Sequence, residues 1–261
     1  MAGTLYIVST PIGNPEDITL RALRTLREVT LIGAEDARIT RQLLQHYGIV
    51  TEVVTYRTRL NSPSPPAPAK PGEEEMVNFL LDGDGSSSNR ILGLLHSGHS
   101  VALVCDAGTP TLADPGHRLI SAALALGAKL VPVPGANAAL TTLVVSDLPT
   151  GRFAFDGFPP RGRADRQAFF AGLKAETRTL ILYETRPYLR STLQTLLTVL
   201  GAEHRITIAQ NLTMPSESFF RGTLSKAIAT LLPHPPRGEY VLILAPPYLV
   251  PTQSVSDTTS L

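Results

Sequence analysis

The chain has 261 residues, of which 43% are hydrophobic, with one cysteine and a formal net charge of +1. A chain of this size buries roughly 70–75% of the surface that its unfolded form exposes, so its stability requires neither a disulfide nor a metal. The lone cysteine, Cys105, excludes an intramolecular disulfide and a multi-cysteine zinc site. The near-neutral charge excludes a general polyanion binder, so any nucleic-acid contact requires a local positive patch.

The sequence also bears on cellular location. No apolar run approaches the roughly 18 residues that a membrane span requires, and the N-terminus has no basic stretch before an apolar one. We therefore expect neither a membrane span nor a signal peptide. A single cysteine within an apolar run fits the reducing cytoplasm, where we expect the protein to work without a metal.

Short apolar runs alternate with helical segments along the chain, which predicts an α/β fold. Continuous apolar runs of this kind are typical of strands that are buried on both faces of a sheet. Strands are expected at residues 5–8, 29–32, 101–104, 129–133, 179–182, 205–208 and 240–244.

Two helix starts have the same signal, a capping side chain followed by proline. Asn14-Pro15 predicts an N-cap and a first helical residue, and apolar residues at helical spacing follow as far as Val29. Asp114-Pro115 repeats this signal, and Gly127 is expected directly after the end of that second helix.

Two α/β domains are expected, because a Phe-, Gly- and Pro-rich stretch interrupts the pattern in the middle of the chain. The first domain comprises residues 1–149 and includes a Pro-, Gly- and Ser-rich excursion at about 61–89. The second comprises residues 150–246. Residues 247–261 contain one charged side chain and no periodicity, so we expect a disordered tail.

Three turns of small residues and proline close three strands of the N-terminal half, at residues 11–14, 106–110 and 134–138. In a parallel sheet they would emerge at one edge, where ligand crevices form. The first turn lacks the lysine of a Walker loop and the three glycines of a dinucleotide fingerprint, and Glu16 and Asp17 would repel a phosphate. The edge therefore favours a neutral or cationic ligand. Taken alone, the first turn is equally compatible with a tight strand-to-helix connection.

Asp106 is the acidic side chain at the heart of these turns. One interpretation is a helix cap or an Asx turn. The other is an anchor for the positive end of a ligand, such as an amino group or a sulfonium.

Several stretches of the chain then match one family in order. They are residues 5–18, Ala34-Glu35-Asp36-Ala37-Arg38, Cys105-Asp106-Ala107-Gly108-Thr109-Pro110 with Ala113-Asp114-Pro115-Gly116, Val133-Pro134-Gly135-Ala136-Asn137-Ala138, Leu182-Tyr183-Glu184 and Gly238-Glu239-Tyr240-Val241. Together they resemble the ribosomal RNA small subunit methyltransferase I family, a branch of the tetrapyrrole methylase superfamily. The resemblance covers about residues 3–246.

The resemblance implies two α/β domains with a cofactor cleft between them, and a homodimer. It implies an S-adenosylmethionine-dependent methyltransferase that modifies the ribose 2′-hydroxyl of a cytidine in small-subunit (16S) ribosomal RNA during ribosome biogenesis. The cofactor carries a sulfonium and an amino group but no phosphate, which agrees with the turns. The implied cofactor-binding residues are Pro11, Gly13, Asp106, Ala107, Gly108, Thr109, Pro110, Ala113, Pro134, Gly135, Ala136, Asn137, Ala138, Tyr183 and Ala245.

The nucleophile in this reaction, the ribose hydroxyl, has to lose a proton. Because a ribose hydroxyl is a very weak acid, we expect a carboxylate within reach to take its proton. Glu35 and Asp36 are the candidates, with Arg38 to orient one of them or to meet an RNA phosphate. A helix N-cap is the alternative role for one acid. Both acids are expected across the cleft from the Asp106 turn.

RNA binding also requires positive groups near the site. The candidates are Arg57, Arg59, Arg161, Arg163, Arg166 and Arg186. Arg161 and Arg163 flank a glycine and form the best candidate for a phosphate clamp. Tyr56 and Phe158 are candidates for stacking on an unstacked base, with core packing as the alternative.

Two other functions are considered, and a departure from the family keeps the second of them open. Residues 57–62 read Arg-Thr-Arg-Leu-Asn-Ser, where the family carries a histidine-rich segment that ends in Asn-Glu. One alternative is a methyltransferase of the same superfamily with another acceptor, such as a tetrapyrrole carbon. The other is a cofactor-binding, ribosome-associated module without catalysis.

Overall fold

The structure is a computed structural model that describes residues 1–56, 87–233 and 238–247. The chain divides into two compact units, Met1–Asn137 and Ala138–Leu261, and each contains one five-stranded sheet. Among the helices of the described ranges, none has the length and apolar character that crossing a bilayer requires.

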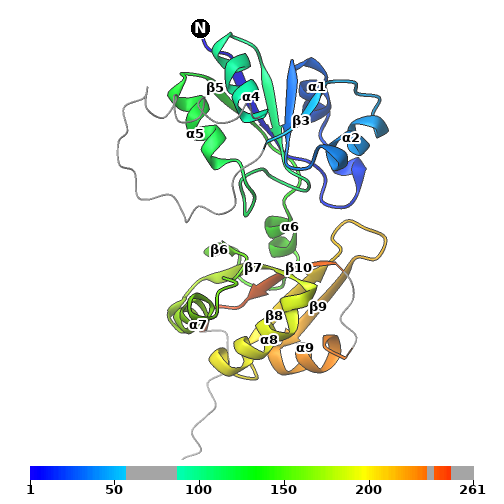
Figure 1. Cartoon of the computed structure of the whole chain (residues 1–261). Coiled ribbons are helices and arrows are strands. Elements are labelled where there is room, and N and C mark those ends of the chain that lie inside the picture. Colours follow the sequence, from blue (N-terminus) through cyan, green and yellow to red (C-terminus); the bar gives the residue numbers. More distant parts are fainter. Residues whose placement is uncertain (57–86, 234–237, 248–261) are drawn as a thin grey trace, which may run out of the picture. The chain divides into compact units, whose positions relative to one another are not determined.

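The first unit is a parallel sheet with strand order β3-β2-β4-β1-β5. In Figure 1, α1 and α2 lie on one side of this sheet and α4 and α5 on the other. Its elements are β1 (Thr4–Val8), the 3-10 turn η1 (Pro15–Asp17), α1 (Leu20–Glu28), β2 (Leu31–Ala34), α2 (Ala37–His46), β3 (Val53–Thr55), α4 (Ser87–His96), β4 (Val101–Val104), α5 (His117–Ala125) and β5 (Lys129–Val133).

Alternating strand residues give this sheet two apolar faces. Ala102 and Val104 pack with α1 and α2 in one buried cluster, which also contains Leu26. Val101 and Leu103, their neighbours in β4, pack with α4 and α5 in a second cluster. Because both faces are buried, the continuous apolar runs that predicted the strands are explained.

Two of the predicted helix starts were wrong by a few residues. Asn14 caps only η1, where its side chain accepts from the Glu16 N–H, and α1 begins after a second cap at Thr19. The helix α5 begins after Gly116 rather than at Asp114-Pro115. Gly127 has a φ of 72° directly after the C-cap residue of α5, as predicted.

The second unit is a mixed sheet with strand order β6-β7-β10-β8-β9, in which only the β6–β7 pair of the described strands is parallel. Its elements are α6 (Ala138–Val144), β6 (Phe153–Gly157), α7 (Arg163–Gly172), the 3-10 turn η2 (Leu173–Ala175), β7 (Thr179–Thr185), α8 (Arg186–Leu200), β8 (Arg205–Gln210), β9 (Ser218–Thr223), α9 (Leu224–Leu231) and β10 (Glu239–Leu244).

The helix α6 belongs to this second unit, so the structure divides the chain before α6, whereas the predicted boundary lay after it. In Figure 1, α6 lies on the opposite face of the second sheet from α8 and α9. The residues that follow α6 are bonded to the same sheet, since Thr207 donates its hydroxyl to the Ser146 carbonyl at 2.7 Å. Arg221 donates to the Val145 carbonyl at 2.7 Å.

Some predictions fall on residues that the structure does not describe. The excursion at 61–89 lies outside the described residues except for its last three positions, which begin α4. The predicted tail at 247–261 lies outside them apart from Pro247.

Candidate functional site

The three small-residue turns of the first unit are bonded to one another at the carboxyl edge of the sheet. Thr10 and Gly108 form an isolated antiparallel bridge, with N–H to carbonyl distances of 2.8 and 3.1 Å. Thr109 receives the Ser9 hydroxyl at 3.1 Å and donates its own to the Ala136 carbonyl at 3.3 Å. The turns after β1, β4 and β5 therefore form one continuous floor, which we call the turn floor (residues 9–14, 106–116 and 134–137).

Glycine is required at two points of the turn floor because the chains approach closely. A Cβ atom on Gly135 would lie 2.9 Å from the Ser9 Cβ, which is closer than real Cβ contacts. Gly108 has a φ of +83°, and a Cβ there would lie 3.3 Å from the Ile12 Cγ2. The absence of a side chain at these two glycines therefore lets the turns pack closely against one another.

The middle turn also holds non-glycine residues in the left-handed region. Thr111 has a φ of 73° and Ala113 a φ of 65°. This conformation is unusual for a β-branched residue such as Thr111, and such strain gathers at ligand-binding loops. Ala113 was one of the predicted cofactor-binding residues.

The acidic residues of the site lie next to one another, at the ends of the adjacent strands β2 and β4. The Asp106 carboxylate accepts the Asp36 N–H at 2.9 Å, and the Glu35 carboxylate accepts the Asp106 N–H at 3.4 Å. The prediction that Glu35 and Asp36 lie across a cleft from Asp106 was wrong. Because β2 pairs with β4 in the sheet, their carboxyl ends bring these residues into direct contact.

Asp36 has the capping role that was the alternative for one of the two acids. Its side chain accepts the Arg38 N–H at 2.8 Å at the start of α2, and the Arg38 guanidinium lies 2.6 Å from it. These hydrogen bonds, the side-chain bond to Arg38 first, lower the pKa of Asp36 to about 2. Arg38 therefore orients Asp36, as one of its two predicted roles required.

The pKa of Asp106 is shifted in the opposite direction from that of Asp36. Partial burial raises the pKa of Asp106, and the nearby Asp36 charge acts in the same direction, against the Asp36 N–H bond and the Arg38 charge. With Glu35, these carboxylates outnumber the single guanidinium of Arg38 in the cluster. An edge of this kind attracts a cation and disfavours a phosphate.

A cavity of about 390 Å³ opens between the turn floor and α2. Its lining residues are Thr10, Pro11, Gly13, Pro15, Ile39, Thr40, Gln42, Leu43, His46, Cys105 and Asp106. Three of the predicted cofactor residues, Pro11, Gly13 and Asp106, are among them. The Thr40 hydroxyl is buried there, and it has no hydrogen-bond partner within the part of the chain that the structure describes.

The α2 residues of this cavity were missed by the sequence analysis. Ile39, Leu43 and His46 recur at intervals of four and three residues, which places them on one helical face. That spacing, applied to the segment after Arg38, was the available signal.

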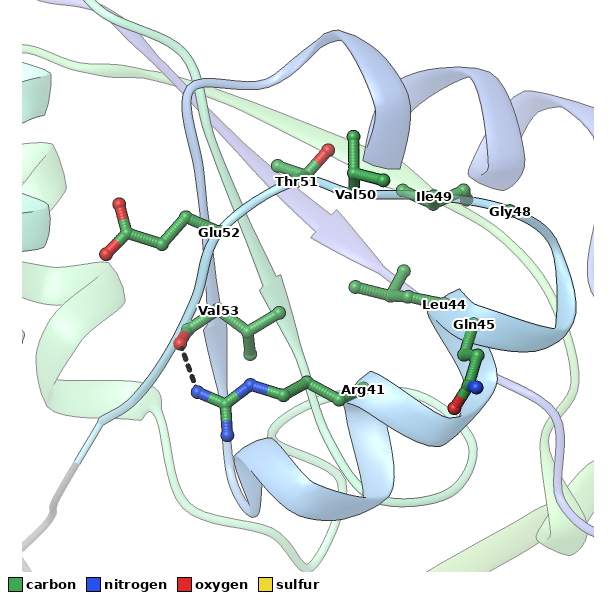
Figure 2. Close-up of a pocket in the computed structure, with 9 residues that line it drawn as sticks. All are labelled: Arg41, Leu44, Gln45, Gly48, Ile49, Val50, Thr51, Glu52 and Val53. Atoms are coloured by element: carbon green, nitrogen blue, oxygen red, sulfur yellow. Dashed lines mark hydrogen bonds between the residues drawn. The ribbon is translucent and has the colours of Figure 1, made fainter.

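A second cavity of about 480 Å³ lies between the C-terminal part of α2 and the segment leading into β3 (Figure 2). Arg41 donates to the Val53 carbonyl at 3.0 Å, and the Glu52 carboxylate lies at the opposite end from Gln45. Glu52 is paired with Arg90. No predicted site residue lines this cavity, and its charged groups are already engaged with the protein.

Three of the predicted cofactor residues belong to the second unit: Ala138, which begins α6, Tyr183 and Ala245. Tyr183, in β7, receives the Ala139 N–H of α6 on its hydroxyl at 3.2 Å. Its ring meets Phe155 and Phe158 edge to face, with centroid distances of 4.9 and 5.6 Å. Ala245 is buried directly after β10, and its N–H donates to the Arg205 carbonyl at 3.0 Å.

The predicted RNA-binding arginines differ in their surroundings. Arg161 contacts the buried carboxylate of Glu184 at 2.9 Å, whereas Arg163 and Arg186 are exposed at the starts of α7 and α8. Arg57 and Arg59 lie outside the described residues.

The two aromatic candidates for base stacking also differ. Tyr56 is 4% exposed, belongs to the core beneath α4 and α5, and donates its hydroxyl to the Pro115 carbonyl at 3.2 Å. Its role is therefore core packing, and stacking on an RNA base was a wrong prediction. Phe158 is 37% exposed, so a base can reach its ring.

Comparison with known proteins gives the chain a family. A sequence profile of the Tetrapyrrole (Corrin/Porphyrin) Methylases matches residues 4–228. The ribosomal RNA small subunit methyltransferase I of Halalkalibacterium halodurans is 40% identical over 242 residues, which are 93% of this chain and 75% of that protein. The protein of the same name from Thermotoga maritima is 38% identical over 243 residues, which are 93% of this chain and 98% of that protein.

Solved structures share the fold. A cobalt precorrin-4 methyltransferase is 16% identical with a TM-score of 0.61, and the match covers 93% of this chain and 94% of that chain. For uroporphyrin-III-C-methyltransferase from Thermus thermophilus the identity is 20%, the TM-score 0.57 and the coverage 92% and 94%. The two α/β units and the sequence matches confirm the resemblance that the motifs predicted, and the chain belongs to the tetrapyrrole methylase family, within its ribosomal RNA small subunit methyltransferase I group.

Proposed function

We propose that the protein transfers a methyl group from S-adenosylmethionine to the ribose 2′-hydroxyl of a cytidine in small-subunit ribosomal RNA. The observation that carries the proposal is the contact of Glu35 and Asp36 with Asp106 of the turn floor, which joins a candidate base to an acidic edge that disfavours a phosphate. The names of the most similar relatives supply the acceptor class, ribosomal RNA of the small subunit.

The residues present suit S-adenosylmethionine. Asp106 and its acidic neighbours match a ligand with a sulfonium and an amino group. Gly108 and Gly135 let the turns pack closely against one another, so the proposed adenosine site is a continuous surface of small residues. When bound, the cofactor supplies an electrophilic methyl group, and its sulfur becomes a neutral thioether. The proposed holding groups are those of the turn floor, with Asp106 toward the positive part.

The chain's own contribution to the chemistry is position and one proton transfer. The turn floor fixes the reacting groups in line, which supplies much of the rate of a displacement. Glu35 accepts the proton of the 2′-hydroxyl while the new C–O bond forms and the C–S bond breaks. Asp36 is a poor base because Arg38 lowers its pKa to about 2, so a proton bound there is lost readily. Glu35 is therefore the proposed base, and Asp36 and Arg38 hold the start of α2.

The proposal is tested by methyl transfer from labelled S-adenosylmethionine to small ribosomal subunits, with naked small-subunit RNA as the second substrate. We expect label in RNA, released on digestion as 2′-O-methylcytidine. Calorimetric titration with S-adenosylmethionine gives a separate readout of the cofactor site. Binding without transfer to either substrate would support a non-catalytic module, and transfer only to a tetrapyrrole would support the other acceptor class.

Two further parts of the proposal concern the whole protein. We infer a cytoplasmic homodimer, since its substrate class is found with ribosomes and the family resemblance implies a dimer. Sedimentation equilibrium of the full chain tests the dimer, and a molecular mass of one chain across the micromolar range would contradict it.

A further inference from the structure

Glu184, near the end of β7, is a buried acid that the proposed chemistry does not use. Its side chain is 0% exposed. One carboxylate oxygen receives the Arg161 guanidinium and the Thr185 N–H, both at 2.9 Å. The other receives the Thr192 hydroxyl from α8 and lies 3.6 Å from the Arg166 guanidinium. The carboxylate is therefore fully partnered, which burial of a charge requires.

The two arginines on this carboxylate are held in different ways. The Arg166 side chain is 14% exposed and donates to the Pro160 carbonyl and to the Thr192 hydroxyl, so it is bonded to groups within the unit. The Arg161 side chain is 39% exposed, although it touches a fully buried acid. One carboxylate faces two guanidiniums, so the cluster carries a net positive charge, and Arg161 is the part of it that solvent reaches.

Aromatic rings fix the guanidinium of Arg161 from the side. Its central carbon lies 3.9 Å from the ring centroid of Tyr188 and 5.7 Å from that of Phe158. Tyr188 and Phe158 are themselves 40% and 37% exposed. A guanidinium that is stacked on tyrosine and bonded to a buried carboxylate has one orientation before any ligand arrives, so binding costs little side-chain entropy.

This combination fits a single-stranded RNA segment. A fixed guanidinium plane donates to a phosphate or stacks on an unpaired base, and neighbouring exposed aromatic rings add stacking surface. Arg163 and Arg186, at the starts of α7 and α8, are exposed in the same unit and carry further positive charge. A surface salt bridge alone would not require the acid to be completely buried or the arginine to be stacked.

We propose that Glu184 is a positioning residue that presents Arg161, with Tyr188 and Phe158, as a preorganised contact for single-stranded ribosomal RNA. The proposal rests on the proposed function and names the surface of the second unit that recognises its substrate. Glu184 acts through Arg161 and touches neither cofactor nor reacting atoms.

The first test is the loss of the arginine. Arg161→Ala is expected to raise the KM for small ribosomal subunits by about tenfold or more, the effect of losing one charge-assisted contact. The kcat and the Kd for S-adenosylmethionine are expected to stay unchanged. The slope of log K for RNA binding against log salt is expected to fall by about one in magnitude. Arg161→Lys is expected to recover only part of the affinity, because an ammonium lacks the planar guanidinium.

The second test shows whether Glu184 works through Arg161. Glu184→Gln retains the shape of the side chain but removes the charge and replaces one accepting oxygen by an amide N–H group, and is expected to raise the same KM severalfold. In the Arg161→Ala background it is expected to add nothing, because the two residues act as one unit. Glu176→Gln is the matched control, since Glu176 pairs with Arg178 in the same unit at 2.8 Å, and it is expected to leave KM unchanged.

An unchanged KM and salt slope for Arg161→Ala would overturn the proposal, and additive effects in the double variant would overturn the role of Glu184. These outcomes are separate from failure of the proposed function, which is absence of transfer by the unaltered protein. In that case, filter binding of naked small-subunit RNA to the unaltered protein and Arg161→Ala still tests the contact. If Glu184→Gln does not fold, the Arg161 variants still decide the RNA contact, because Arg166 and Thr192 remain on the carboxylate.

Discussion

The two units place acidic and basic groups at their sheet ends in opposite ways. In the first, Glu35, Asp36 and Asp106 gather in a half-exposed cluster at the ends of β2 and β4, with Arg38 as their paired cation. In the second, one acid, Glu184, lies completely buried under two arginines at the end of β7. The charges at the first edge therefore favour a cation, and those at the second favour an anion.

This contrast teaches how one chain can handle a cationic methyl donor and a polyanionic acceptor while its formal net charge is only +1. Total charge carries no information about either site, because it sums all the charged side chains of the chain. Electrostatic selectivity is local, and it depends on which side chains are fixed and which are reachable. The four predictions that follow test the two halves of this comparison, in decreasing order of expected effect.

The largest effect is expected at Glu35. Glu35→Gln retains an acceptor for the Asp106 N–H but cannot take a proton, so kcat for small ribosomal subunits should fall about 10²- to 10⁴-fold. Asp36→Asn is the matched variant, because asparagine is also a good N-cap. Since Asp36 is not the proposed base, this change should leave kcat nearly unchanged. The initial rate of labelled methyl transfer is measured for both variants. A full-activity Glu35→Gln, or an equal loss in both variants, would contradict the assignment of the base.

A smaller effect is expected at Asp106. Asp106→Asn preserves an oxygen for the Asp36 N–H but removes the charge, so the Kd for S-adenosylmethionine should rise about tenfold, the cost of roughly 1.4 kcal/mol. The Kd for S-adenosylhomocysteine, which lacks the sulfonium, should rise less if Asp106 faces the sulfur. Calorimetry measures both ligands. Asp156→Asn, in the second unit, is the control, and equal changes in the two variants would remove Asp106 from the cofactor site.

These two sites were not equally visible in the sequence. The turns of the first unit follow the parallel strands β1, β4 and β5. Small residues directly after these apolar runs therefore predicted that the turns meet at one edge of the sheet. The neighbouring positions of β2 and β4 were not predicted, because strand order is set by long-range pairing. For that reason Glu35 was expected far from Asp106.

Among the described strands, the sequence analysis missed β3, β6 and β9, which are three of the four edge strands, whereas it predicted the fourth, β5. An edge strand has one unpaired side, so it carries fewer apolar residues in a row than a central strand. The Glu184 cluster was missed for a related reason. A buried acid looks like any surface acid until the fold brings Arg161 before α7, Arg166 of α7 and Thr192 of α8 to it.

A methyl group at Gly108 of the turn floor is expected to destabilise the protein. Gly108→Ala places a Cβ at a φ of +83° and 3.3 Å from the Ile12 Cγ2, so the free energy of unfolding should fall by about 1–2 kcal/mol. Gly93→Ala, inside α4 where a Cβ would meet no described atom beyond its own helix within 4 Å, should instead stabilise the protein by up to about 1 kcal/mol. Urea unfolding measures both, and a neutral Gly108→Ala would show that the floor relaxes without cost.

The smallest effect is expected from His204, a buried polar residue of the second unit. It is 3% exposed, and in the part of the chain that is described its Nε2 has no hydrogen-bond partner. Burial, which outweighs a hydrogen bond with the Ala245 backbone, lowers the pKa of His204 below 6.5. The unfolded chain therefore binds more protons than the folded protein, and stability should fall as the pH drops from 6.5 toward the folded-state pKa.

His204→Gln should therefore flatten the stability profile between pH 6.5 and the folded-state pKa. Urea unfolding of the variant and the unaltered chain across that pH range measures the difference. An equal slope in His204→Gln and the unaltered chain would show that the buried imidazole gains a proton in the folded state at no cost. The second unit would then tolerate an isolated buried charge, and the full pairing of Glu184 would lose its physical necessity.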